Sequence, residues 1–150
     1  MTLALQIARS LVIVVGISVA TEARAEIRVE SAWVRETPGK MTMTAGYARI
    51  VNDGSQTDEL MGVTAAEAGS AEVHQTVRDG GMMKMEPVEK LKIAAHGEIK
   101  IEPGGYHLMI TDLKRKLVPG ETLQMTFRFA RGGEIAVQAK VAPISATRAP

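Results

Sequence analysis

Apolar and polar residues alternate near the C-terminus of this chain, and this pattern limits the folds that the chain can adopt. Residues 123–129 read Leu-Gln-Met-Thr-Phe-Arg-Phe, and residues 135–141 repeat the alternation with smaller apolar side chains. Successive side chains of a strand point to opposite faces, so each segment is predicted to be a strand with one buried face. The Arg131-Gly132-Gly133 turn between them predicts a hairpin.

Short segments with strand character continue upstream, separated by turns that contain glycine, proline or asparagine. No long segment has the 3.6-residue period of a helix, and residues 65–70 are expected to form one helical turn at most. Many short strands at this spacing predict an all-β fold, an antiparallel β-sandwich or barrel with Greek-key connections. The predicted strands are residues 32–36, 45–52, 59–64, 71–77, 82–88, 98–102, 106–113, 123–129 and 135–141.

The N-terminus has the pattern of an export signal. Arg9 precedes an apolar run from Leu11 to Ala20, and residues 21–25 end in the small-x-small form of a signal-peptidase site. The run is shorter than the roughly 20 residues that span a bilayer. We therefore expect cleavage after Ala25 and a periplasmic location, with a retained membrane anchor as the alternative.

The remaining chain has the size of one domain. Removing residues 1–25 takes away two of the 18 basic and one of the 17 acidic residues, so the formal net charge falls from +1 to zero. This balance gives no electrostatic reason to expect a nucleic acid or an anionic membrane as partner. We predict a signal peptide at residues 1–25, a β domain at 26–141 and a flexible tail at 142–150, where two prolines accompany little apolar bulk.

His107 and Met109 are the first pair of candidate functional residues. Residues two apart in a strand share a face, and these two point away from the face that carries Leu108 and Ile110. The chain has no cysteine and only three histidines. Imidazole and thioether together suit a soft metal ion, and the ion that they fit best is Cu(I).

His74 is the second candidate for an imidazole ligand. It lies with Glu72 and Thr76 on the polar face of its predicted strand, so two strands each present a histidine away from the core. A single such histidine is more often solvated or hydrogen-bonded than a ligand, but the two placements together favour a near-surface metal site. His96 lies in a predicted turn, where an ordinary polar side chain is expected.

The methionines divide by position into core residues and candidate ligands. Met61 and Met125 lie on predicted strands where packing explains them. Met41 and Met43 lie in a loop-like segment. Three others form a cluster just after the turn at residues 79–81: Met82, Met83 and Met85. Spacing alone does not say which member of this cluster would reach an ion between strands.

Four of these candidates have a spacing that is specific to one family. Ten residues separate His74 from Met85, and twenty-one separate Met85 from the His107-x-Met109 pair. This pattern resembles the ligand motif of the periplasmic copper chaperones of the PCu(A)C type, and it selects Met85 from its cluster. The resemblance covers nearly the whole chain after residue 25, and the other segments that carry it are residues 32–35, 46–52, 72–74, 83–85 and 103–109.

The resemblance implies a cupredoxin-like β-barrel that binds one Cu(I) per chain through His74, Met85, His107 and Met109. It implies a metallochaperone rather than an enzyme, delivering copper for the binuclear copper centre of cytochrome c oxidase. The partner would be a copper-accepting protein such as an oxidase subunit or another copper assembly chaperone. Some relatives carry a His- and Met-rich tail, but residues 142–150 contain neither residue, so no second site is expected there.

Other classes of function remain as alternatives. A periplasmic copper-storage or resistance protein would use the same ligands. An electron-transfer cupredoxin needs a Cys thiolate at its copper, and the chain has none. A zinc enzyme built from His74, His107 and Glu72 would leave the methionines without a role, because catalytic zinc takes nitrogen, thiolate or carboxylate ligands. A metal-free structural or adhesion sandwich would make the four-residue spacing a coincidence.

Overall fold

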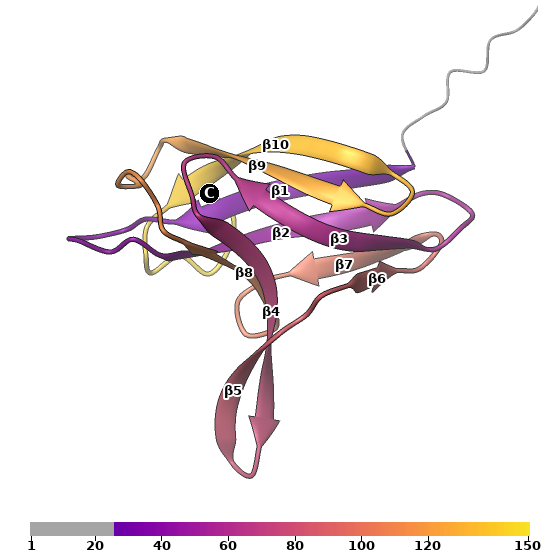
Figure 1. Ribbon diagram of the computed structural model, residues 1–150, viewed down its shortest axis with the longest axis horizontal. Helices are drawn as coiled ribbons and strands as arrows, with labels where there is room; N and C mark the ends of the chain where they lie inside the picture. Colours follow the sequence, from indigo (N-terminus) through magenta and orange to yellow (C-terminus); the bar gives the residue numbers. More distant parts are fainter. Residues whose placement is uncertain (1–25) are drawn as a thin grey trace, which may run out of the picture.

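The computed structural model of the protein describes residues 26–150, and the predicted signal at residues 1–25 lies outside this part. Its regular structure consists of ten strands, and none of the described residues is helical (Figure 1). No helix able to cross a membrane is found among them. The strands are β1 (Ile27–Arg35), β2 (Thr44–Asn52), β3 (Asp58–Ala65), β4 (Ser70–Asp79), β5 (Met82–Pro87), β6 (Leu91–Ile93), β7 (Gly97–Ile101), β8 (Tyr106–Thr111), β9 (Thr122–Phe129) and β10 (Gly133–Ala142).

Seven of the strands close into a barrel. In the order of their pairing they are β4, β8, β2, β1, β10, β9 and β3, and one register pair, Val63 opposite Ala71, joins β3 back to β4. The β1–β10 pairing is parallel, and the other pairings of this ring are antiparallel. The remaining strands extend the wall, with β6 beside β3 and β7 beside β2. The predicted all-β fold is confirmed, and the parallel β1–β10 pair is an addition to the antiparallel scheme.

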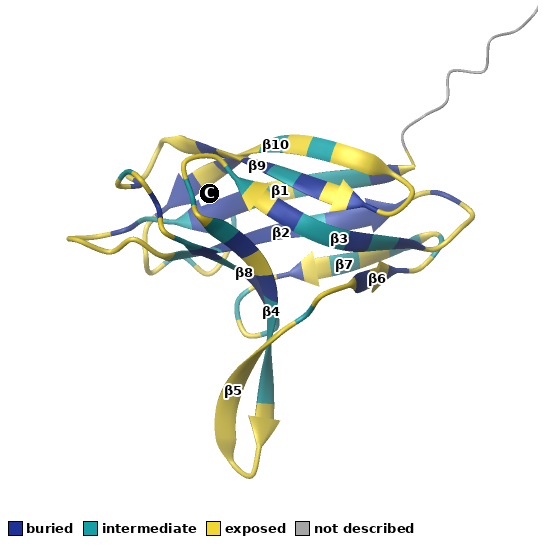
Figure 2. Cartoon of the chain, in the orientation of Figure 1, coloured by how far each residue is buried: buried dark blue, intermediate teal, exposed yellow. Residues whose placement is uncertain are grey.

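The C-terminal hairpin fills the barrel interior in the way that its alternation predicts. In β9 the residues Leu123, Met125, Phe127 and Phe129 are buried, whereas their polar neighbours face outward. Figure 2 shows the same dark, buried stripes along the strands of the barrel, and the outer hairpin tips are exposed. Full burial of a side chain such as Phe127 stabilises the fold by roughly 1.5–3 kcal/mol. These contacts provide the frame that positions the outward-facing side chains.

The sequence pattern misses β6 and the first half of β1. β6 has only three residues, too few to show a period. In β1 the pairing register shifts between Glu30 and Trp33, where Ser31 has a φ of 51°. Such a bulge changes which face the following residues occupy, so simple alternation fails across it. Residues 65–70 form no helical turn, because Glu67 turns the chain with a φ of 58°.

The C-terminal residues 142–150 lie against the barrel. Alanines of this segment pack on Trp33 and Tyr47, and Arg35 Nη2 donates a hydrogen bond of 3.1 Å to the Ala146 carbonyl. β10 ends one residue beyond the predicted domain boundary. The predicted tail is therefore docked in this structure, and its flexibility stays a prediction.

β4 and β5 form a hairpin that projects from the barrel (Figure 1). β4 pairs with β8 in the barrel wall up to Gln75, and beyond this residue it pairs with β5 alone. All six residues of β5 are exposed, as Figure 2 shows. The hairpin therefore carries side chains from the barrel wall out into solvent, and His74 lies where the wall ends.

Candidate metal site

His74 and His107 face each other on two neighbouring strands. They are direct partners in the antiparallel register of β4 and β8, so their side chains lie on the same face of the sheet. Their ring centroids are 5.9 Å apart, and the ring planes are inclined by 45°. Zinc–imidazole bonds are about 2.0–2.1 Å long, so rings at this separation leave room for one ion between them.

Glu72 orients the ring of His74. The distance from His74 Nε2 to Glu72 Oε2 is 3.2 Å. An ionised carboxylate can only accept, so Nε2 carries the proton and donates it, which leaves the lone pair on Nδ1. His74 Nδ1 is buried and has no hydrogen-bond partner. Carboxylate–histidine pairs of this kind fix the tautomer and orientation of metal-binding imidazoles.

His107 lies deeper than a near-surface site requires. It is only 8% exposed, on a strand that pairs with β4 on one side and with β2 on the other. Its Nδ1 lies 3.5 Å from the Gly105 carbonyl oxygen, a long hydrogen bond in which only the ring can donate. This leaves the lone pair on Nε2, which is buried without a partner.

Unpartnered buried nitrogens are rare enough to need an explanation. Among residues 26–150, three buried side-chain nitrogen or oxygen atoms lack a hydrogen-bond partner: Arg35 Nε, His74 Nδ1 and His107 Nε2. Two of these three are imidazole nitrogens with free lone pairs on rings that lie together. An ion that accepts both lone pairs would satisfy both atoms at once.

Strand parity separates the three methionines of β5. Met85 lies opposite Thr76 and Met83 opposite Arg78, so both share the face of His74. Met82 lies opposite Asp79 and points to the other face. Met85 lies diagonally across the hairpin from His74, whose direct partner is Pro87. Met85 is 60% exposed and lines a pocket with His107 and Met109. The structure thus brings Met85 to the histidines and leaves Met82 away from them.

Met109 reaches the same pocket from β8. It lies opposite Glu72 on β4 and opposite Ala45 on β2, and it is half-buried. The pocket has a volume of about 230 Å³. His107, Met85 and Met109 therefore line one pocket, and His74 lies beside it against His107. All four residues singled out in the sequence gather at one end of the barrel wall.

Two further methionines line this pocket, and sequence reasoning did not place them there. Met41 and Met43 come from the loop between β1 and β2. Their occurrence in a loop, where burial does not explain an apolar side chain, is the signal in the sequence. The sequence could not show that this loop lies beside His107 and Met109 of β8, because that contact depends on the tertiary structure.

The donors of the site carry no net charge. Arg35 and Glu36 also line the pocket, and their formal charges cancel. Within the described residues, no three His, Cys, Asp or Glu side chains are grouped so that they could hold an ion. Glu72 instead hydrogen-bonds to His74. The available donor set thus consists of imidazole nitrogen and thioether sulfur, which favours a soft monovalent ion.

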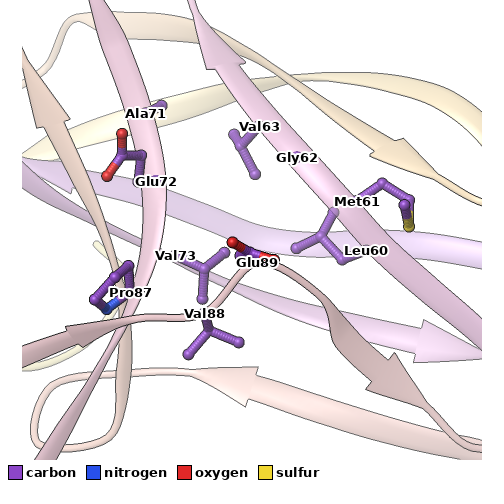
Figure 3. Close-up of a pocket in the computed structure, with 10 residues that line it drawn as sticks. All are labelled: Leu60, Met61, Gly62, Val63, Ala71, Glu72, Val73, Pro87, Val88 and Glu89. Atoms are coloured by element: carbon purple, nitrogen blue, oxygen red, sulfur yellow. The ribbon is translucent and has the colours of Figure 1, made fainter.

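A larger pocket of about 430 Å³ opens between β3 and β4. Figure 3 shows Val63, Val73 and Val88 around this gap, whereas the sulfur of Met61 points away from it. The gap forms because β3 and β4 pair at a single register position before they diverge. None of the residues that line it is a histidine, so it is not a candidate for the same chemistry.

Comparison with known proteins places the chain in a family. The model of the LpqE-like family, described as "Putative lipoprotein LpqE-like", matches residues 27–141, and the chain belongs to this family. The chain is also 32% identical over 120 residues to "Putative lipoprotein Lxx21020" of Leifsonia xyli subsp. xyli. That alignment covers 79% of this chain and 71% of the relative.

Solved structures share the fold. The solution structure of the Cu(I) form of DR1885 from Deinococcus radiodurans is 30% identical with a TM-score of 0.65, and the match covers 87% of each chain. The copper-bound PCuAC domain from PmoF2 has a TM-score of 0.68 at 24% identity, covering 79% of this chain and 93% of that domain, a likeness that shows the fold alone. The resemblance to PCu(A)C-type proteins is confirmed.

Proposed function

We propose that this protein is a Cu(I)-binding metallochaperone that holds one ion through His74 Nδ1, Met85 Sδ, His107 Nε2 and Met109 Sδ. The observation that carries the proposal is the pair of buried, unpartnered imidazole nitrogens on opposed strands, next to a pocket lined with thioethers. The likeness to the Cu(I) form of DR1885 supports the choice of ion.

The chemistry of the donors distinguishes Cu(I) from other ions. Thioether sulfur is soft and binds without losing a proton, whereas zinc in catalytic sites takes nitrogen, thiolate or carboxylate. A zinc enzyme would need a third ligand from Glu72, but this carboxylate is engaged with His74. The enzyme alternative is therefore the weaker one.

The position of Met85 suits delivery rather than permanent storage. It is 60% exposed on a hairpin that projects from the barrel, so an acceptor can approach the ion from this side. Four neutral ligands leave the positive charge of Cu(I) uncompensated, which favours its release to another set of ligands. We propose a copper-accepting protein as the partner, in the periplasm, and the binuclear copper centre of cytochrome c oxidase as the destination. Nucleic acid has no part in this proposal.

An anaerobic titration with Cu(I) against a coloured chelator tests the ligand set. The protein is expected to take up one equivalent tightly, and His107→Ala or Met85→Leu to remove most of this affinity. Met82→Leu is the matched control for Met85, because Met82 is equally exposed on β5 but points to the other face. His96→Asn is the control for loss of a histidine, since His96 lies in the turn before β7. Equal competition by the wild type and both ligand variants would show that the ligand set is wrong.

A further inference from the structure

Met41 and Met43 are two large apolar side chains that the fold leaves in contact with solvent. They are 44% and 46% exposed. Together with Met85 they line the pocket that His107 and Met109 also line. A methionine gains roughly 1.5–3 kcal/mol from full burial, which neither residue obtains here. Packing therefore gives little reason for two sulfur-bearing side chains at this place, whereas soft-metal chemistry gives one.

Both ends of the loop that carries them are fixed to the barrel. Thr37 is fully buried, and its Oγ1 accepts a hydrogen bond of 2.8 Å from the N–H of Leu117. At the other end, the carbonyl of Thr42 accepts a hydrogen bond of 2.9 Å from the N–H of Leu113. These bonds hold the loop beside the pocket, so the fold sets the backbone position of Met43 and leaves its side chain free to turn.

Between these anchors the loop makes few contacts. Residues 38–43 are all exposed. Gly39 has a φ of 66°, in the left-handed region that favours glycine, and nothing lies within 4 Å of the place a Cβ would take. Methionine is unbranched and adapts its shape readily. The two thioethers can therefore reorient over the pocket while the ends of the loop stay in place.

We propose that Met41 and Met43 form an auxiliary Cu(I)-binding pair at the mouth of the pocket, through which the ion enters and leaves the four-ligand site. This inference rests on the proposed function. The step is a ligand exchange: a Cu–S bond to Met41 or Met43 forms as a bond to Met85 or Met109 breaks. The ion stays Cu(I), and because thioethers are neutral at all relevant pH values no proton moves in this exchange.

The pair completes a path from solvent to the buried histidine. His107 is 8% exposed, so an incoming ion cannot meet its Nε2 first. Met41 and Met43 are exposed and line the same pocket of about 230 Å³. Capture at the mouth makes the next step intramolecular, which raises the effective concentration of the ion near the inner ligands.

Methyl NMR of protein labelled with [methyl-13C]methionine tests this arrangement directly. Ag(I), a redox-inert soft ion, and then Cu(I) under argon would be titrated into the protein. The first equivalent is expected to shift Met85 and Met109, and further ion to shift Met41 and Met43 at lower affinity. Met82 should stay unshifted over the same range, since it points to the other face of the hairpin.

The double variant Met41→Leu/Met43→Leu tests the role in transfer. Both positions are exposed, so leucine should leave the fold intact. We expect the affinity for the first Cu(I) to change by less than about threefold, whereas the rate of uptake from a bulky Cu(I)–chelator complex falls at least about tenfold, as expected when an intramolecular step is lost. Met82→Leu should retain the wild-type rate.

The possible outcomes separate this inference from the proposed function. Shifts at Met85 and Met109 without any at Met41 and Met43, or an unchanged uptake rate in the double variant, would overturn the auxiliary pair alone. Equal shifts at Met41, Met43 and Met82 would also overturn it, because they would mean nonspecific thioether binding. Absence of shifts at Met85 and Met109 would overturn the proposed function itself.

Discussion

Removal of the Glu72 carboxylate should weaken Cu(I) binding although all four proposed ligands remain in place. Glu72 Oε2 lies 3.2 Å from His74 Nε2 and determines that the other nitrogen, Nδ1, presents its lone pair. Loss of such a supporting partner typically costs 10–100-fold in metal affinity. The Glu72 side chain is 62% exposed, so water can partly replace it, and the lower end applies. We expect Glu72→Ala to weaken Cu(I) binding about tenfold, or about 1.4 kcal/mol.

The assay is the anaerobic competition titration, with thermal unfolding as a check that the fold is intact. Glu72→Gln keeps an oxygen acceptor near His74 and should lose less affinity than Glu72→Ala. The control is Glu86→Ala, which removes an exposed carboxylate that lies opposite Gln75 on the other face of the hairpin. Glu72→Ala with wild-type affinity would refute the orienting role. Equal losses in Glu72→Ala and Glu86→Ala would show a general charge effect instead.

Two further predictions concern stability. Asp58 is buried and accepts hydrogen bonds from the backbone N–H groups of Glu59, Arg131 and Gly132. Asp58→Ala should therefore lower the free energy of unfolding in urea by about 3 kcal/mol and leave the Cu(I) affinity unchanged. A loss of stability below about 1 kcal/mol would contradict this role. Burial raises the pKa of Tyr47, although the nearby charge of Arg35 opposes the shift. The folded state therefore favours the neutral phenol, and this stabilisation is present below about pH 10 and lost as the pH rises through the raised pKa. Tyr47→Phe should thus reduce the alkaline loss of stability in pH-dependent unfolding, and an unchanged profile would exclude Tyr47 as its source.

The local alternation of apolar and polar residues was sufficient to predict most strands, because burial on one face imposes a two-residue period. The alternation of residues 123–129 predicted β9 together with the residues that it buries. The same rule failed where the backbone departs from regular pairing. The bulge at Ser31 hid the first half of β1, and β6 was too short to show a period.

The candidate site shows a similar division. Parity alone grouped His107 with Met109 on one strand and Glu72 with His74 on the other, and the register of β4 and β8 brings both pairs to the same face of the sheet. Parity did not predict that His107 would be buried, since a polar face can still be covered by neighbouring strands and loops. Nor could parity choose between Met83 and Met85, which share a face, and the resemblance was needed to select Met85.

Residue order along the chain is enough to specify the strand pattern, the faces on which the histidines and methionines lie, and the soft, neutral character of the donors. Only folding establishes which strands are neighbours and in what register, so that His74 meets His107 and the loop with Met41 and Met43 lies at the same pocket. Alternation specifies no more than the face of each side chain. Partner and register depend on long-range hydrogen bonding and barrel closure, which no local segment encodes.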